Sequence, residues 1–302
     1  MTRNLAVIGL GHMGLPMAQR LIAAGYPVCG FDLNLDLRAE FKDAGGIPRP
    51  TASEAVRDAE VVILMLPSSA VVDQVLIGEG VLHQLSPGSV VVDMSSSDPI
   101  STQRLAALAA QHSVGFVDAP VSGGVVRAVT GDLTIMVGGD AETVAQIRPL
   151  LEEMGSKVAH LGQVGAGHAV KSLNNLLGAT SLLIAAEALE VGRAFGLDPD
   201  LLVETFNSST GRSWSTEYKL PTFVLQETFN SGFALDLMVK DIRIALGLAT
   251  SVGVTAGVAA STVDVWSTAM SELPSDADHT EIARWVRQRA EVNQALDGGP
   301  DS

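Results

Sequence analysis

The first 32 residues constrain the fold of this chain more than any other segment. The apolar run Asn4–Ile8 predicts a short buried strand, Leu15–Ala24 predicts a helix, and Val28–Phe31 predicts a second strand that ends at Asp32. A glycine-rich turn joins the first strand to the helix. This order of strand, glycine turn, helix, strand and acid is typical of a dinucleotide-binding unit. The turn consists of Gly9, Leu10, Gly11, His12, Met13 and Gly14.

Each glycine of that turn has a physical role in such a unit. Gly9 permits the tight turn, Gly11 leaves room for the backbone to approach a pyrophosphate, and Gly14 lets helix and strand pack closely. The helix N-terminus offers N–H groups and the positive end of its dipole to the phosphates. Asp32 is placed to accept hydrogen bonds from a ribose 2′-hydroxyl. The alternatives are a purely structural glycine turn and, for Asp32, an ordinary turn residue at a strand end.

Charge and cysteine content narrow the classes of partner and compartment. The formal net charge of −15 argues against nucleic acid and against an anionic membrane surface. Cys29 is the single cysteine, which excludes an intrachain disulfide and fits a reducing compartment. Ile244–Val263 is uncharged and long enough to span a bilayer, but Gly253 and Gly257 predict a break between two buried helices. We therefore expect a cytoplasmic protein without a membrane segment, and we predict no metal site.

Strand and helix signals alternate up to about residue 162. Solid apolar runs are typical of parallel strands buried on both faces, and the alternation predicts a doubly wound, Rossmann-type α/β sheet. Further strands are expected at Val61–Leu66, Ser89–Asp93, Gly115–Asp118, Leu133–Val137 and Lys157–His160. Helices between them are expected at Ala52–Ala59, Ser101–His112 and Glu142–Met154.

Beyond residue 162 the strand signals stop and helices are expected. Ala169–Phe195 predicts one long helix, which is nearly apolar all round between Leu176 and Ala186 and should therefore be buried. We predict a dinucleotide-binding domain at 1–162, an all-α substrate and oligomerisation domain at 163–296, and a loose tail at 297–302. Subunits are expected to pack across the long helix as a homodimer or a homotetramer.

Two later segments carry groups suited to binding and proton transfer. Ser122, Gly123 and Gly124 follow a predicted strand and offer N–H groups suited to a carboxylate, with a plain glycine turn as the alternative. Lys171 and Asn175 are four residues apart and share one helix face. A lysine in this apolar helix should be desolvated, which lowers its pKa and suits a general acid and base. The alternative is a lysine that reaches solvent from the start of a buried helix.

Lys240 and Asp241 form a third segment, for which a solvated charge pair on a helix is the alternative. His168 lies just before Lys171, and we expect it to pack or to meet solvent.

Together these segments resemble the β-hydroxyacid dehydrogenase family, and the resemblance runs from Leu5 to about Gln288. The glycine turn matches the family's cofactor turn. Residues 118–124 match its substrate loop, residues 165–175 match its catalytic motif, and residues 237–241 match its late motif.

The resemblance implies a role for each matched residue. Lys171 is then the catalytic acid and base, and Asn175 orients the substrate. The loop Ser122–Gly124 holds the substrate carboxylate, and Lys240 lines the site near the nicotinamide. Three further residues match cofactor contacts, namely Leu66, Pro67 and Ser96, the last standing where relatives usually have threonine.

The implied activity is an NAD-dependent transfer of hydride between nicotinamide and a small 3-hydroxy acid such as 3-hydroxyisobutyrate. NADP is disfavoured, because its users in the family often carry Asn-Arg after the second strand, where this chain has Asp32, Leu33 and Asn34. Alternatives within the family are a tartronate- or succinic-type semialdehyde reductase and a threonate- or sulfonate-type dehydrogenase. Arg212 is a candidate for reading a second polar group of the substrate. An imine reductase is disfavoured because those relatives usually lack the lysine that stands here at 171.

One alternative comes from a different class, a non-catalytic dinucleotide-binding protein on the same fold. Lys171 together with Asn175 argues against it, because a protein that only binds needs neither.

Overall fold

The computed structural model describes the backbone of residues 3–297 and the side chains of residues 3–291. It divides into two compact units, Met1–Lys171 and Ser172–Ser302. The boundary falls inside the longest helix, α9 (Ala166–Ala194), so each unit is described by itself.

The first unit is built on a nine-stranded sheet with the order β3-β2-β1-β4-β5-β6-β8-β7, and β9 pairs with β8. The strands from β3 to β6 are parallel, whereas β8 is antiparallel to β6, so the predicted parallel sheet has a mixed edge. The strands are β1 (Leu5–Ile8), β2 (Val28–Phe31), β3 (Ile47–Pro48), β4 (Val61–Leu64), β5 (Val90–Asp93), β6 (Gly115–Asp118), β7 (Val121–Ser122), β8 (Thr134–Gly138) and β9 (Lys157–Gly162). Neither β3 nor β7 was predicted, because each is two residues long and carries no periodic signal.

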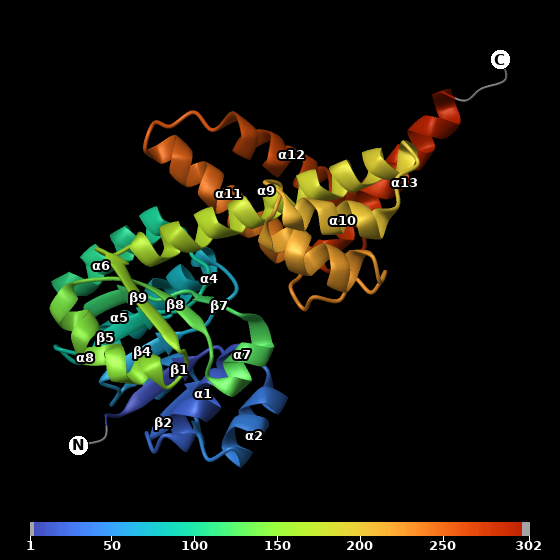
Figure 1. The fold of residues 1–302 in the computed structure, drawn as a ribbon. Coiled ribbons are helices and arrows are strands. Elements are labelled where there is room, and N and C mark those ends of the chain that lie inside the picture. The colour runs from blue at the N-terminus through green and yellow to red at the C-terminus, as the bar shows by residue number, and fades with distance from the viewer. Residues whose placement is uncertain (1–2, 298–302) are drawn as a thin grey trace. The chain divides into compact units, whose positions relative to one another are not determined.

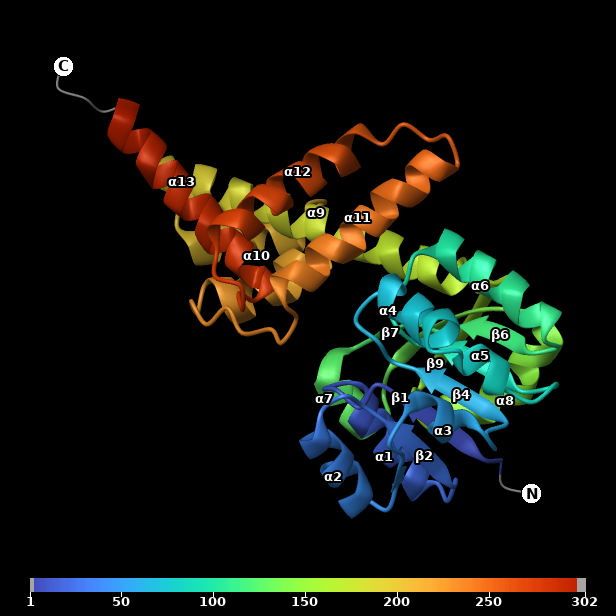
Figure 2. The same cartoon turned by 180° about the vertical axis from the view of Figure 1, so that it is seen from behind.

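Helices cover both faces of this sheet (Figures 1 and 2), which is why its central strands are continuously apolar. Val7 and Ile63 belong to a core that includes residues of α1 (Gly14–Ala23) and α8 (Ala141–Glu152). Ala6 and Val62 belong to a second core with residues of α3 (Ala52–Val56) and α6 (Pro99–Gln111). The helices are α1 (Gly14–Ala23), α2 (Leu35–Asp43), α3 (Ala52–Val56), α4 (Ser69–Asp73), α5 (Val81–Gln84), α6 (Pro99–Gln111), α7 (Gly124–Thr130) and α8 (Ala141–Glu152), with a π-helical turn at Gln74–Gly78. The doubly wound fold class is confirmed.

The second unit is helical in its described residues, as predicted. Its core surrounds the fully buried Trp266 and includes Leu182, Leu220 and Ile242. The elements after α9 are α10 (Pro199–Ser208), a π-helical segment (Ser215–Val224), α11 (Leu235–Ser251), α12 (Gly257–Glu272), a 3₁₀ turn (His279–Glu281) and α13 (Ile282–Asp297). The predicted break near Gly253 is confirmed, because α11 and α12 pack side by side across it (Figure 1).

The prediction that α9 is buried all round is wrong. Ala179, Leu182 and Leu189 face the helical core, but Leu177 is 73% exposed and Ile184 is 58% exposed. α9 also meets the length and composition criteria for a membrane span, a test that the core helix of a soluble protein passes equally. The helix α13 continues to Asp297, where the tail was predicted to begin, and residues 298–302 lie outside the described residues.

Candidate active site

The glycine turn has the geometry that a dinucleotide requires. Gly9 has a φ of +93°, and a Cβ built on it would lie 2.2 Å from the carbonyl oxygen of Met65. A Cβ on Gly14 would lie 1.9 Å from the carbonyl oxygen of Gly9. Gly11 differs, because no atom would lie within 4 Å of its Cβ. Two glycines therefore close the turn, and the third leaves open space of the kind that a pyrophosphate fills.

Asp32 ties this turn to the end of β2. Its Oδ2 accepts a hydrogen bond from the Leu10 N–H at 2.7 Å, and its Oδ1 accepts one from the Asn34 N–H at 2.8 Å. Each carboxylate oxygen has a second lone pair, so both contacts are compatible with a ribose hydroxyl as a further donor. His12 is exposed, whereas Met13 packs against the core.

The other predicted cofactor contacts follow the carboxyl ends of strands. Leu66 and Pro67 come after β4, and Ser96 comes after β5. The two loops are joined directly, because the Leu66 N–H donates to Ser95 Oγ at 3.0 Å. In open α/β sheets, ligands bind at the edge formed by the carboxyl ends of the parallel strands. These residues and the glycine turn all lie at that edge.

The predicted carboxylate loop joins β7 to α7. Ser122 ends β7, and Gly123 and Gly124 have φ values of +135° and +69°, which favour glycine. Gly123 and Gly124 are exposed, and Ser122 is partly exposed.

The acid that opens this motif has a different role from its neighbours. Asp118 is fully buried at the end of β6, and its Oδ1 and Oδ2 accept hydrogen bonds from the N–H groups of Gly165 at 2.7 Å and His168 at 2.8 Å. Burial raises the pKa of the Asp118 carboxyl, while His168 and the two N–H donors oppose that rise. Asp118 was predicted only as the first residue of the substrate loop, and His168, which is 1% exposed, was expected to pack or to meet solvent.

Lys171 lies one turn further along α9 and is partly exposed. Asn175 follows four residues later on the same helix and is buried. The prediction that Lys171 and Asn175 lie on one helix is therefore confirmed.

In the helical unit, Asn175 is held by a carboxylate. Its Nδ2 donates to Asp241 Oδ2 at 2.6 Å, and the Lys240 Nζ lies 3.3 Å from Asp241 Oδ1. Asp241 is 2% exposed, so the alternative of a solvated charge pair is wrong. The amide of Asn175 thus has a fixed orientation, set by a residue 66 positions away, and sequence spacing did not predict this contact.

Arg212 pairs with Glu217, whose Oε1 lies 2.7 Å from Arg212 Nε, and the two side chains are 63% and 37% exposed. Its charge is therefore already matched within the chain.

A second titratable cluster lies in the helical unit. Burial lowers the pKa of Lys219 to about 8, against an opposing contribution from Asp278. Burial alone would raise the pKa of Asp278, yet hydrogen bonds from His279 and Thr280 hold it well below its usual range. Asp278 also accepts a hydrogen bond from the Gly232 N–H at 2.8 Å, which secures the loop before α11.

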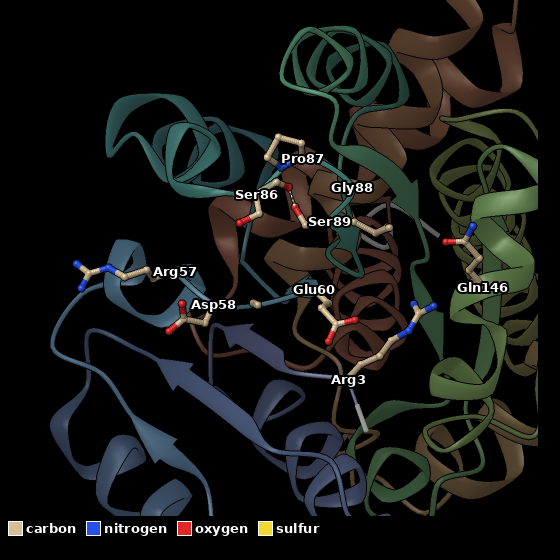
Figure 3. A pocket seen from close by; sticks show the side chains of 11 residues that line it. Arg3, Arg57, Asp58, Glu60, Ser86, Pro87, Gly88, Ser89 and Gln146 are labelled. Atoms are coloured by element: carbon tan, nitrogen blue, oxygen red, sulfur yellow. Dashed lines mark hydrogen bonds between the residues drawn. The ribbon is translucent and has the colours of Figure 1, made fainter. Parts of the chain in front are cut away.

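A hollow of about 410 Å³ lies at the opposite, amino-terminal ends of β4 and β5 (Figure 3). Arg57, Asp58 and Glu60 line it, so its charges are mixed. It contains none of the predicted site residues and lies away from the edge where ligands of parallel sheets bind. Among the described residues, no group of three or more histidine, cysteine, aspartate or glutamate side chains is arranged to hold a metal ion.

Two family models match the chain. Residues 4–162 match the NAD binding domain of 6-phosphogluconate dehydrogenase, and residues 165–286 match the NAD-binding domain of NADP-dependent 3-hydroxyisobutyrate dehydrogenase. The mitochondrial 3-hydroxyisobutyrate dehydrogenase of Mus musculus is 37% identical over 93% of this chain and 86% of the mouse protein. The chain belongs to the β-hydroxyacid dehydrogenase family.

Members of this family with different substrates are similar to the chain. The NAD-dependent L-serine dehydrogenase of Pseudomonas aeruginosa is 39% identical over 80% of this chain and 84% of that protein. The structure of Mycobacterium tuberculosis 3-hydroxyisobutyrate dehydrogenase with L-serine has a TM-score of 0.90 and 33% identity, and covers 95% of this chain and all of that one. The protein is thus an NAD(P)-dependent hydroxyacid dehydrogenase.

Proposed function

We propose that this β-hydroxyacid dehydrogenase oxidises a small 3-hydroxy acid of the 3-hydroxyisobutyrate type, with NAD as cofactor and Lys171 as the general acid and base. The observation that carries the proposal is the pairing on α9 of Lys171 with an Asn175 whose amide is oriented by the buried Asp241. A binding protein has no need of an oriented amide beside a lysine.

The residues divide the work as follows. Ser122, Gly123 and Gly124 bind the substrate carboxylate through their N–H groups. Neutral Lys171 takes the proton of the substrate hydroxyl as the alcohol carbon is oxidised, and in the reverse direction its ammonium protonates the developing alkoxide. Asn175 orients the hydroxyl, and Lys240 lines the site. A bound nicotinamide supplies the hydride acceptor, which is chemistry that the side chains lack.

The preference for NAD rests on Asp32. A carboxylate at this position accepts hydrogen bonds from the ribose diol of NAD and repels the 2′-phosphate of NADP. Its two bonds to backbone N–H groups fix its position at the end of β2.

A substrate panel with both NAD and NADP tests the proposal. It comprises 3-hydroxyisobutyrate, L-serine, glycerate, threonate, a hydroxy sulfonate, 6-phosphogluconate and a simple alcohol of matched length. We expect a small 3-hydroxy acid to have the highest kcat/KM and the matched alcohol to be at least about 100-fold poorer, because it lacks the carboxylate that forms charge-assisted hydrogen bonds with the loop. Equal turnover of the alcohol or of 6-phosphogluconate would refute the assignment. A second assay, which follows NADH oxidation with tartronate or succinic semialdehyde as substrate, tests the alternative of a semialdehyde reductase.

We also propose that two copies of the chain associate through α9. Leu173, Leu177, Ile184 and Val191 are all exposed, and their spacings of four and seven residues place them on one side of the helix. A two-fold axis lets such a stripe meet its own copy. Leu177→Asp with Ile184→Asp should reduce the mass measured by light scattering to that of a monomer. The control Val252→Asp, at an exposed valine after α11, should leave the mass unchanged, and an unchanged mass in the double variant would contradict the proposal.

A further inference from the structure

The start of α9 is capped chiefly from a distant segment, and the local contribution is the Ala166 N–H, which donates to the Gln163 carbonyl oxygen at 3.0 Å. Gly165, which precedes the helix, has no side chain to accept the N–H groups that every helix start leaves unpaired. Asp118 supplies the missing acceptors from the end of β6, with one carboxylate oxygen on the Gly165 N–H and the other on the His168 N–H. The cap of this helix is therefore 47 residues away in the sequence.

Two glycines let the helix start approach the sheet this closely. A Cβ on Gly167 would lie 2.2 Å from the carbonyl oxygen of Met136 in β8, and a Cβ on Gly138 would lie 2.5 Å from Asp118 Oδ1. Both contacts involve backbone or a buried carboxylate, which have no freedom to move aside. The first turn of α9 thus has one position relative to β6 and β8.

His168 adds two further attachments. Its Nδ1 is 2.8 Å from Thr102 Oγ1 in α6, and its Nε2 is 3.0 Å from the carbonyl oxygen of Ser95 after β5. Its ring nitrogens also lie 3.9 Å from carboxylate oxygens of Asp93 and of Asp118. The imidazole therefore joins the helix start to three elements of the sheet unit from a fully buried position.

We infer that Asp118, His168 and Thr102 form a positioning network that sets the placement of Lys171, which lies three residues after His168 on the same helix. The inference rests on the proposed role of Lys171 as acid and base. Proton transfer depends steeply on geometry, and a misplacement of about 1 Å costs on the order of 100-fold in rate. The carboxylate and the imidazole act only through the lysine and touch neither substrate nor cofactor in this scheme.

The test is a double-mutant cycle between Asp118→Asn and Lys171→Ala. Asparagine keeps the shape of the side chain, but it turns an NH₂ group toward one of the two N–H donors. We expect Asp118→Asn to lower kcat by about 10- to 100-fold with little change in KM, and to leave NADH binding, measured by fluorescence titration, unchanged. In the Lys171→Ala background, the same substitution should have almost no further effect on kcat. Additive effects would show that Asp118 does not act through Lys171.

A second pair of variants tests the same network at Thr102, so the inference can still be refuted if Asp118→Asn fails to fold. Thr102→Val removes the hydroxyl at His168 and should lower kcat about 3- to 10-fold, whereas Thr102→Ser, which keeps the hydroxyl, should restore most of it. The control is Thr262→Val, a buried threonine of the helical unit whose hydroxyl is 3.1 Å from that of Thr180, and it should lower Tm without lowering kcat. Equal kcat for the valine and serine variants at position 102 would overturn the inference. The failure of the proposed function is a different result, namely normal kcat in Lys171→Ala alone.

Discussion

Two of the glycine-rich helix starts in the sheet unit, those of α1 and α9, look alike in the sequence but differ in what their N–H groups bind. α1 has no side-chain cap and no acid in its first turn, and the space around Gly11 is open. At α9 the corresponding space is filled, because Asp118 occupies the N–H groups and Met136 packs against Gly167. An open start is suited to bind phosphate, whereas a closed start holds its own helix in place. A glycine-rich helix start is therefore a binding site only where no side chain of the protein already fills it.

The largest effect expected from this comparison is on catalysis. Lys171→Ala should lower kcat by about 10²- to 10⁴-fold, because general acid–base catalysis typically contributes that much. NADH binding should be retained, since the open start at α1 is untouched. Steady-state kinetics and a fluorescence titration measure the two quantities separately. A variant that keeps more than about a tenth of the wild-type kcat would contradict the role of Lys171.

The next effect is on stability, and it distinguishes Gly167, at the closed start of α9, from an ordinary glycine within a helix. Gly167→Ala should lower the free energy of unfolding by about 3 kcal/mol, because overpacking against fixed backbone costs that order of energy. Gly178→Ala is the matched control on the same helix, where no atom would lie within 4 Å of the new Cβ. It should raise stability by up to about 1 kcal/mol through helix propensity. Urea unfolding measures both, and similar values for the two variants would show that the α9 start is not closed.

The open start can be probed through Asp32. Asp32→Asn removes the negative charge and one of the acceptors of the Leu10 and Asn34 N–H groups. The ratio of kcat/KM for NAD to that for NADP should exceed one in the wild type and fall by about 10-fold in the variant, since one charge-assisted hydrogen bond is lost. A wild-type enzyme that uses NADP equally well or better would refute the role given to this carboxylate.

The smallest effect concerns the helical unit. There the ammonium of Lys219 is largely buried, and it caps no helix, unlike the Asp118 carboxylate of the sheet unit. Lys219 has its pKa lowered from 10.5 to about 8, so the folded state binds its proton less tightly than the unfolded state does. The wild type should therefore gain stability relative to Lys219→Met as the pH rises from about 8 to 10.5, by about 1 kcal/mol after allowance for partial exposure. Thermal unfolding of both proteins across that range measures the difference. A difference that is constant with pH would mean that the lysine is not perturbed.

The sequence alone determined most of what is local. The glycine turn and Asp32 are close in the chain, and the collisions that restrict Gly14 come from Gly9 in the same turn. The spacing of Lys171 and Asn175 needed only the helical period. Apolar runs identified the main strands correctly, because a strand covered on both faces has little freedom in composition.

Only the tertiary structure decided the contacts between distant segments. Asp118 was read as part of a substrate loop, and it caps a helix that begins 48 residues later. Asp241 looked like half of a surface charge pair, and it is a buried acceptor for Asn175. α9 looked buried all round, and one side of it is exposed, because periodicity reports how apolar a face is and not what covers it. The physical reason is common to all three: a hydrogen bond or a packed face depends on which residues the fold brings within a few ångströms, and sequence spacing carries that information only inside one helix, strand or turn.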